Sequence, residues 1–116
     1  GIDDALSVVI VQMRPISAAD MGEVRQNIDS LCAWMDRATA GYPGADLVVF
    51  PEGSLQGYHV TNWLDTVVDL AGPEVAALAA HCKQLGVWAH FSLLERHPGG
   101  EKPFNTSILV LSLIHI

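Results

Sequence analysis

The stretch DLVVFPEGSLQGYH, residues 46–59, joins a short apolar run to a proline, a carboxylate and a loop with two glycines. The run at 47–50 is apolar, rich in valine and closed by Pro51, a pattern that predicts a buried β-strand. Glu52 follows the proline directly. In open α/β sheets, ligands bind beyond the carboxyl ends of the strands. Glu52 is therefore a candidate for chemistry if the rest of the chain forms such a sheet.

Two amphipathic helices are predicted on either side of this stretch. Asp20 and Glu23 have the spacing of a capping box with aspartate as N-cap, and the helix is expected to end near Gly41. The sequence GPE at 72–74 opens a second helix, with proline at its first position and an acid in its first turn, and Gly86 closes it. Apolar residues at helical spacing form the expected inner faces: Val24, Ile28, Leu31, Cys32 and Met35 in the first helix, and Val75, Leu78, Ala79, Cys82 and Leu85 in the second.

Three further strands are predicted from apolar runs. LSVVIV at 6–11 reads as a buried strand, and VWAHFSLL at 87–94 as another. A turn at 97–100 leads to a strand at 106–111, and a short helix is expected within 63–70. The resulting order, β-α-β-α-β-β, predicts an α/β layer structure.

Composition narrows the class of protein. A chain of 116 residues with 50% hydrophobic residues has room for one domain with a core. The net charge of -7, with scattered basic residues, argues against nucleic acid or an anionic membrane surface as partner. No apolar run reaches the roughly 20 residues of a spanning helix, and no secretory signal pattern is seen. Two cysteines do not make a disulfide framework, so we expect a cytoplasmic protein.

The candidate residues each have a functional and a structural interpretation. Glu52 is either a general base, partly desolvated beside apolar strand ends, or a solvated loop acid. Cys32 and Cys82 lie in apolar helical stripes, so core packing is the better interpretation for both. The five histidines show no metal-ligand spacing, and no glycine-rich phosphate loop follows the first strand. We therefore expect neither a metal nor a cofactor.

Four segments carry a family resemblance. LVVFPE followed by SLQG, residues 47–57, resembles the first catalytic segment of the nitrilase superfamily, the carbon–nitrogen hydrolases. Three other segments are similar to that family in the same order: LSVVIVQ at 6–12, AGPEVAALAAHCKQLGVWAHFSLLERH at 71–97, and KPFNTSILV at 102–110. The second of these is most similar to the aliphatic amidase and formamidase branch.

The resemblance implies an α-β-β-α sandwich, usually in a homo-oligomer, that hydrolyses small amides or nitriles without metal or organic cofactor. It implies a Glu-Lys-Cys triad in which Glu52 matches the general base. The family's lysine follows the fourth strand and its cysteine comes later, so we do not carry the lysine role onto Lys102. The amidase branch has an aromatic residue where this chain has Gly53, which leaves the shape of the acyl pocket open.

Two expectations about organisation follow. Residues 1–110 are expected to be the N-terminal part of a carbon–nitrogen hydrolase domain, inactive alone, and residues 111–116 a truncated or foreign tail. The alternative is a non-catalytic α/β binding or interaction domain that keeps the scaffold. A nucleotide binder of flavodoxin type is disfavoured because no phosphate loop is present.

Overall fold

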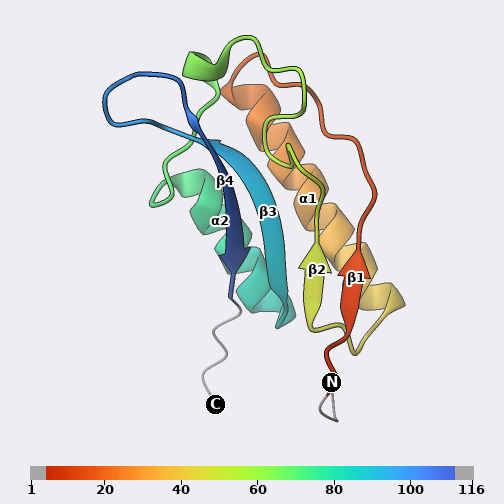
Figure 1. The fold of residues 1–116 in the computed structure, drawn as a ribbon. Coiled ribbons are helices and arrows are strands. Elements are labelled where there is room, and N and C mark those ends of the chain that lie inside the picture. Colours follow the sequence, from red (N-terminus) through yellow and green to blue (C-terminus); the bar gives the residue numbers. More distant parts are fainter. Residues whose placement is uncertain (1–4, 112–116) are drawn as a thin grey trace.

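The computed structural model describes residues 5–111 as a sheet of four strands with two helices (Figure 1). The α/β class and the predicted order of elements are confirmed. In chain order the elements are β1 (Val8–Ile10), α1 (Met21–Gly41), β2 (Leu47–Val49), a 3-10 helix η1 (Trp63–Asp65), α2 (Pro73–Leu85), β3 (Trp88–Glu95) and β4 (Phe104–Val110).

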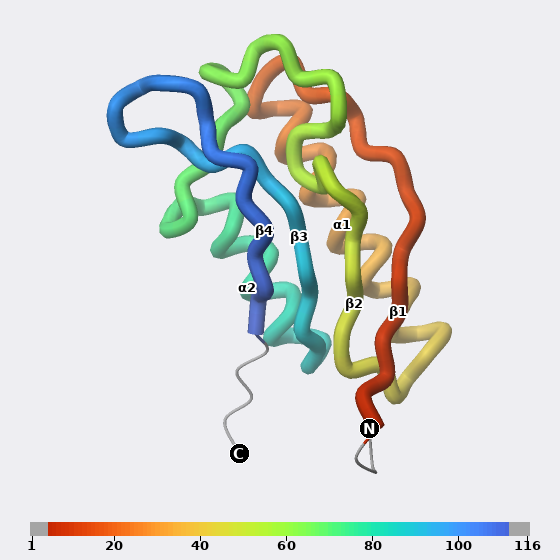
Figure 2. The backbone as a smooth tube through the Cα atoms, viewed as in Figure 1, coloured from red at the N-terminus to blue at the C-terminus, as the bar shows by residue number. Residues whose placement is uncertain are grey.

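The strands lie in the spatial order β1-β2-β3-β4. β1 pairs with β2 and β2 with β3 in parallel, each connection passing through a helix, whereas β3 and β4 form an antiparallel hairpin. The carboxyl ends of the three parallel strands consequently meet at one end of the sheet. Figure 2 shows that the loop after β2 and the β3–β4 loop reach this same end.

Local signals explain where the helices begin and end. Asp20 caps α1 by accepting a hydrogen bond from the Glu23 N–H at 2.9 Å, as the predicted capping box requires. The Glu23 carboxylate accepts from the N–H of Ala19, one residue before the cap. α2 begins with Pro73, whose missing N–H costs nothing at that position, and ends at Gly86 in the left-handed conformation.

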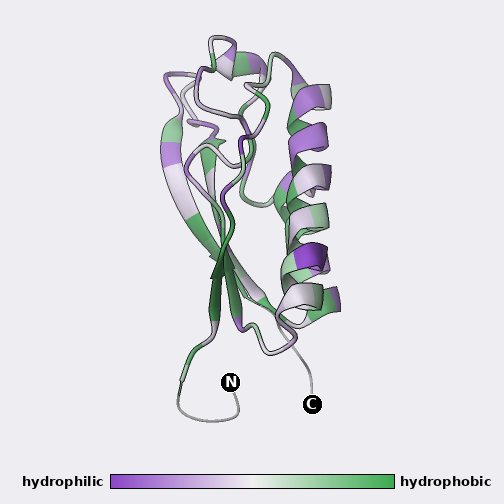
Figure 3. Ribbon diagram, turned by 90° about the vertical axis from the view of Figure 1, so that its right-hand side faces the viewer, coloured by the Kyte–Doolittle hydropathy of each residue, from purple (hydrophilic) through white to green (hydrophobic). Residues whose placement is uncertain are grey.

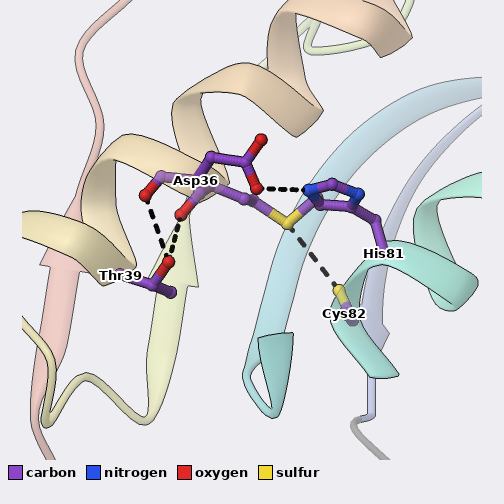
Figure 4. A network of polar contacts seen from close by, with 5 residues as sticks. Asp36, Thr39, His81 and Cys82 are labelled. Carbon is purple, nitrogen blue, oxygen red and sulfur yellow. Dashed lines mark hydrogen bonds and ion pairs between the residues drawn. The ribbon is translucent and has the colours of Figure 1, made fainter. Parts of the chain in front are cut away.

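Both helices pack on the same face of the sheet, and the core lies between the helices and the sheet (Figure 3). Val48 and Ala89 are opposite one another in the sheet and fully buried beneath the helices. The inner faces of the helices are confirmed in α1 by Val24, Ile28, Leu31 and Met35 and in α2 by Leu78 and Cys82, all buried. Two polar contacts join the helices: His81 lies 2.8 Å from Asp36, and the Cys82 thiol lies 3.8 Å from the Met35 sulfur (Figure 4).

The opposite face of the sheet is uncovered by any of residues 5–111, and this corrects one expectation. The run 6–11 was predicted to be a buried strand, but β1 is only three residues long, and Val8 and Ile10 are exposed. Strand residues alternate between faces, so only Val9 turns toward the helices. Ile10, 70% exposed, pairs with Val49 on the uncovered face, and Val49 in turn pairs with His90.

Two other elements have boundaries that differ from the predicted ones. The helix expected within 63–70 is a single 3-10 turn, and the fourth strand begins at Phe104 rather than Thr106 because it pairs with the whole end of β3. Leu111 follows the end of β4, and the rest of the proposed tail, 112–116, lies outside the described residues. Over the described range, neither helix has both the length and the apolar character needed to cross a bilayer.

Candidate active site

Glu52 lies beyond the carboxyl end of β2, where the sequence places it, at a cavity of about 420 Å³. This volume lies within the range of roughly 300–1,000 Å³ that small-molecule sites occupy. The cavity is lined from the loop after β2, from η1, from the end of β3 and from the start of β4, by Glu52, Gly53, Gln56, Gly57, Tyr58, Val60, Trp63, Leu93, Leu94, Lys102, Pro103 and Asn105.

The environment of Glu52 differs from the expectation of a partly desolvated carboxylate. Its side chain is exposed. Glu52 begins the turn at 52–56, and the buried positions of that turn are taken by Ser54, Leu55 and Gln56. The carboxylate therefore faces solvent and the cavity, because the apolar contacts of the segment are made by its neighbours.

Two glycines explain the tight course of this loop. Gly53 has φ +67°, and a Cβ added there would lie 2.8 Å from the Gly57 carbonyl oxygen. Gly57 has φ +90°, and its Cβ would lie 2.5 Å from the Ile16 carbonyl oxygen. L-residues with side chains rarely adopt such φ values, and the space is already filled by backbone. Glycine at position 53, where the resemblance implies an aromatic residue in the amidase branch, is thus favoured by this backbone.

The cysteines lie away from the cavity and pack between the helices, as predicted. Cys82 is fully buried and Cys32 half-buried. Burial raises the pKa of each thiol from its ordinary value of 9.0 to about 11, and the nearby Asp29 and Asp36 add to the shift at Cys32. Neither thiol has the thiolate character that a nucleophile needs at neutral pH.

The histidines are likewise distributed over separate parts of the structure. His81 pairs with Asp36, and His97 lies 4.9 Å from the Phe104 ring in the β3–β4 hairpin. His90 is half-buried as expected, but its Nδ1 is buried and has no hydrogen-bond partner within 5–111. His115 lies outside the described residues. No group of three or more His, Cys, Asp or Glu side chains among the described residues could hold a metal ion.

Three residues of the site region were given no role from the sequence. Gln56 and Lys102 line the cavity, Lys102 from the β3–β4 loop. Asn27 is buried and contacts the loop after β2 by a hydrogen bond from its Nδ2 to the Leu55 carbonyl oxygen at 2.9 Å. Asn27 follows Val24 by three residues on the buried face of α1. A polar residue in an apolar helical stripe needs a buried hydrogen-bond partner, and this feature of the sequence could have identified Asn27.

Comparisons with known proteins agree with this arrangement. The chain is 37% identical over 91 residues to a formamidase of Helicobacter acinonychis, and 37% identical over 90 residues to a formamidase of Bacillus thuringiensis. Each match covers 76% of this chain and 27% of the relative. The chain therefore spans about a quarter of the length of these curated relatives.

Solved structures show the same fold. Nit3 of Saccharomyces cerevisiae, a member of branch 10 of the nitrilase superfamily, superimposes with a TM-score of 0.72 at 21% identity, over 92% of this chain and 40% of that one. The CN-hydrolase superfamily protein XC1258 of Xanthomonas campestris gives 0.71 at 25% identity, over 92% and 37%. The sequence profile described as carbon-nitrogen hydrolase matches residues 7–112. The chain thus belongs to the carbon–nitrogen hydrolase family.

Proposed function

We propose that this chain supplies the general base, Glu52, of an amidase that hydrolyses small amides to a carboxylic acid and ammonia. The observation that carries the proposal is the position of Glu52 at a cavity beyond the carboxyl end of β2, in a chain that belongs to the carbon–nitrogen hydrolase family. A carboxylate exposed at such a site can accept a proton from a group that enters the cavity.

The chemistry proposed for Glu52 is proton transfer to and from a thiol nucleophile. Glu52 takes the thiol proton, and the sulfur attacks the amide carbon, so that the electron pair of the C=O bond moves onto oxygen. The C–N bond then breaks, and the leaving nitrogen takes the proton from Glu52 and departs as ammonia. Water, deprotonated by Glu52, attacks the resulting thioester and releases the acid and the thiol. A lysine stabilises the negative oxygen of each tetrahedral intermediate.

Neither the thiol nor that lysine is assigned within these 116 residues. Cys32 and Cys82 are poor candidates because their thiols pack between the helices with a raised pKa. Lys102 lines the cavity, but it precedes β4, whereas the family pattern places the lysine after that strand. We propose that both groups belong to the portion of the family domain that this chain does not span, and that the complete protein is a cytoplasmic homo-oligomer.

The substrate proposed is a small amide, since the curated relatives described above are named formamidases. Gly53 lines the cavity beside Glu52 and contributes only backbone to its wall. Residues of the remaining family domain would complete that wall and select among amides.

Substitution of Glu52→Gln in the complete protein tests the proposal. General acid–base catalysis contributes about 10²- to 10⁴-fold, so the turnover number for a small amide is expected to fall by that factor. Glu101→Gln is the matched control: it makes the same chemical change at an exposed glutamate of the β3–β4 loop that does not line the cavity. A Glu52→Gln variant as active as Glu101→Gln would refute the assignment and favour a non-catalytic binding domain.

A further inference from the structure

The turn that carries Glu52 is attached to the edge of β3 by side chains that replace a missing strand. β2 ends at Val49, but β3 continues to Glu95. Its edge beyond β2 therefore has backbone groups that need other partners. The first of these is met by backbone, since the Phe50 N–H donates to the His90 carbonyl at 3.0 Å.

The next partners come from the turn itself. The Ser54 hydroxyl oxygen accepts from the Ser92 N–H at 3.2 Å, and the Ser54 hydroxyl donates to the Pro51 carbonyl. The Leu55 N–H donates to the Ser92 carbonyl at 3.3 Å. Glu52 is thus held between two points on the β3 edge, one before it at Phe50 and one after it at Ser54.

Gln56 makes the most extensive of these contacts. Its Oε1 accepts from the Leu94 N–H at 2.9 Å, and its Nε2 donates to the carbonyls of Leu94 at 3.1 Å and Thr66 at 2.9 Å. The side chain is 1% exposed. Both ends of the amide bond to backbone and both of its N–H groups are used, so Gln56 borders the cavity without an N–H to offer a substrate.

We propose that Gln56 is a positioning residue that fixes the carboxylate of Glu52 relative to the sheet; the inference rests on the proposed function of Glu52. Glutamine suits this place because it is long enough to reach Leu94 and presents an acceptor and two donors together. Glutamate has the same shape but loses the donors, and methionine fills similar space without any of these hydrogen bonds.

The magnitude of the expected effect comes from geometry. Gln56 is four residues from Glu52 in a single turn, and the Gly57 N–H closes that turn on the Gly53 carbonyl at 2.7 Å. Loss of the contacts to Leu94 leaves the turn bound to β3 only through Phe50, Ser54 and Leu55, so its end can shift relative to β3. A displacement of a catalytic group by about 1 Å costs on the order of 100-fold in rate.

The experiment is a double-mutant cycle in the complete protein with Gln56→Met, Glu52→Gln and both together, assayed where every variant is folded. Gln56→Met is expected to lower kcat for a small amide by about 100-fold with little change in KM. Added to Glu52→Gln, it should lower the residual rate only slightly, because Gln56 acts through Glu52. Gln56→Glu places a buried carboxylate oxygen against the Leu94 and Thr66 carbonyls, so it should not restore the activity lost in Gln56→Met.

A second readout and a control separate positioning from stability. The rate at which iodoacetamide alkylates the nucleophilic thiol, measured against pH, should change in the same direction in Gln56→Met as in Glu52→Gln. Leu78→Ala truncates a fully buried side chain of α2 that takes no part in the hydrogen bonds between the turn and β3. It should lower the stability of the protein while leaving the pH profile of thiol alkylation unchanged.

Two results would overturn the inference. One is an unchanged kcat and alkylation profile in Gln56→Met. The other is an equal loss in the Glu52→Gln background, which would show that Gln56 acts independently of Glu52. A Glu52→Gln variant with full activity would instead refute the proposed function, so the two failures are distinguishable.

Discussion

Replacement of Gly57 by alanine tests whether the turn bearing Glu52 is built against the segment that follows β1. The magnitude has two parts. An alanine held at φ +90° adopts a left-handed conformation that costs about 1–2 kcal/mol. Its Cβ would also lie 2.5 Å from the Ile16 carbonyl oxygen and 2.6 Å from the Ser17 Cα. Both contacts are with backbone, so main chain must move, which costs about 1–3 kcal/mol more.

We therefore expect Gly57→Ala to destabilise the complete protein by about 2–5 kcal/mol. Thermal unfolding followed by fluorescence measures this as a lower Tm, by on the order of 5 °C for a domain of a few hundred residues. Gly41→Ala is the matched control. Gly41 is the last residue of α1, its φ is not positive, and an added Cβ would meet nothing within 4 Å.

The two glycines should consequently respond in opposite directions. Alanine is preferred over glycine in a helix by about 0.5–1 kcal/mol, so Gly41→Ala is expected to leave Tm unchanged or slightly raised. Equal Tm values for the two variants would show that the backbone contact between residue 57 and residues 16–17 does not exist in the folded protein, and the account of the turn would be wrong.

Two further predictions concern the chain itself. Burial raises the pKa of the Cys32 and Cys82 thiols from an ordinary 9.0 to about 11, so their contribution to stability is complete below pH 9 and is lost as the pH rises toward 11. Urea unfolding across this pH range should show the loss. A Cys32→Ser/Cys82→Ser variant with the same pH dependence of stability would contradict this prediction. The 116-residue chain alone should hydrolyse no small amide, since its thiols lie outside the cavity, and release of ammonia that disappears on Glu52→Gln would disprove this.

Much of the fold followed from short-range signals in the sequence. The aspartate cap at residue 20 and the Gly86 end of α2 depend on residues close together in the chain, and these boundaries were predicted well. The order of strands and helices was also correct, because apolar runs alternating with amphipathic segments admit few arrangements. The position of Glu52 just beyond the end of β2 was also predicted, because the apolar run at 47–50 and Pro51 mark where that strand ends.

The exposure of individual strand residues was harder to predict. A run such as 6–11 has valine and isoleucine on both faces, and the sequence does not say how many layers cover a strand. The structure leaves Ile10 exposed because helices pack on only one side. The expectation that Glu52 is partly desolvated failed similarly, since its neighbours in the turn take the buried positions.

The sequence by itself determined the helices, the order of elements along the chain and the place of Glu52 after a strand, because each depends on periodicity or on caps that act over a few residues. Only the tertiary structure decided which polar side chains hold that glutamate. Gln56 bonds to Leu94 across 38 positions of sequence, and Asn27 reaches Leu55 across 28. The bond between Gln56 and Leu94 forms because β3 is longer than β2, so the free backbone groups of β3 take partners from the segment that the folded chain places beside them.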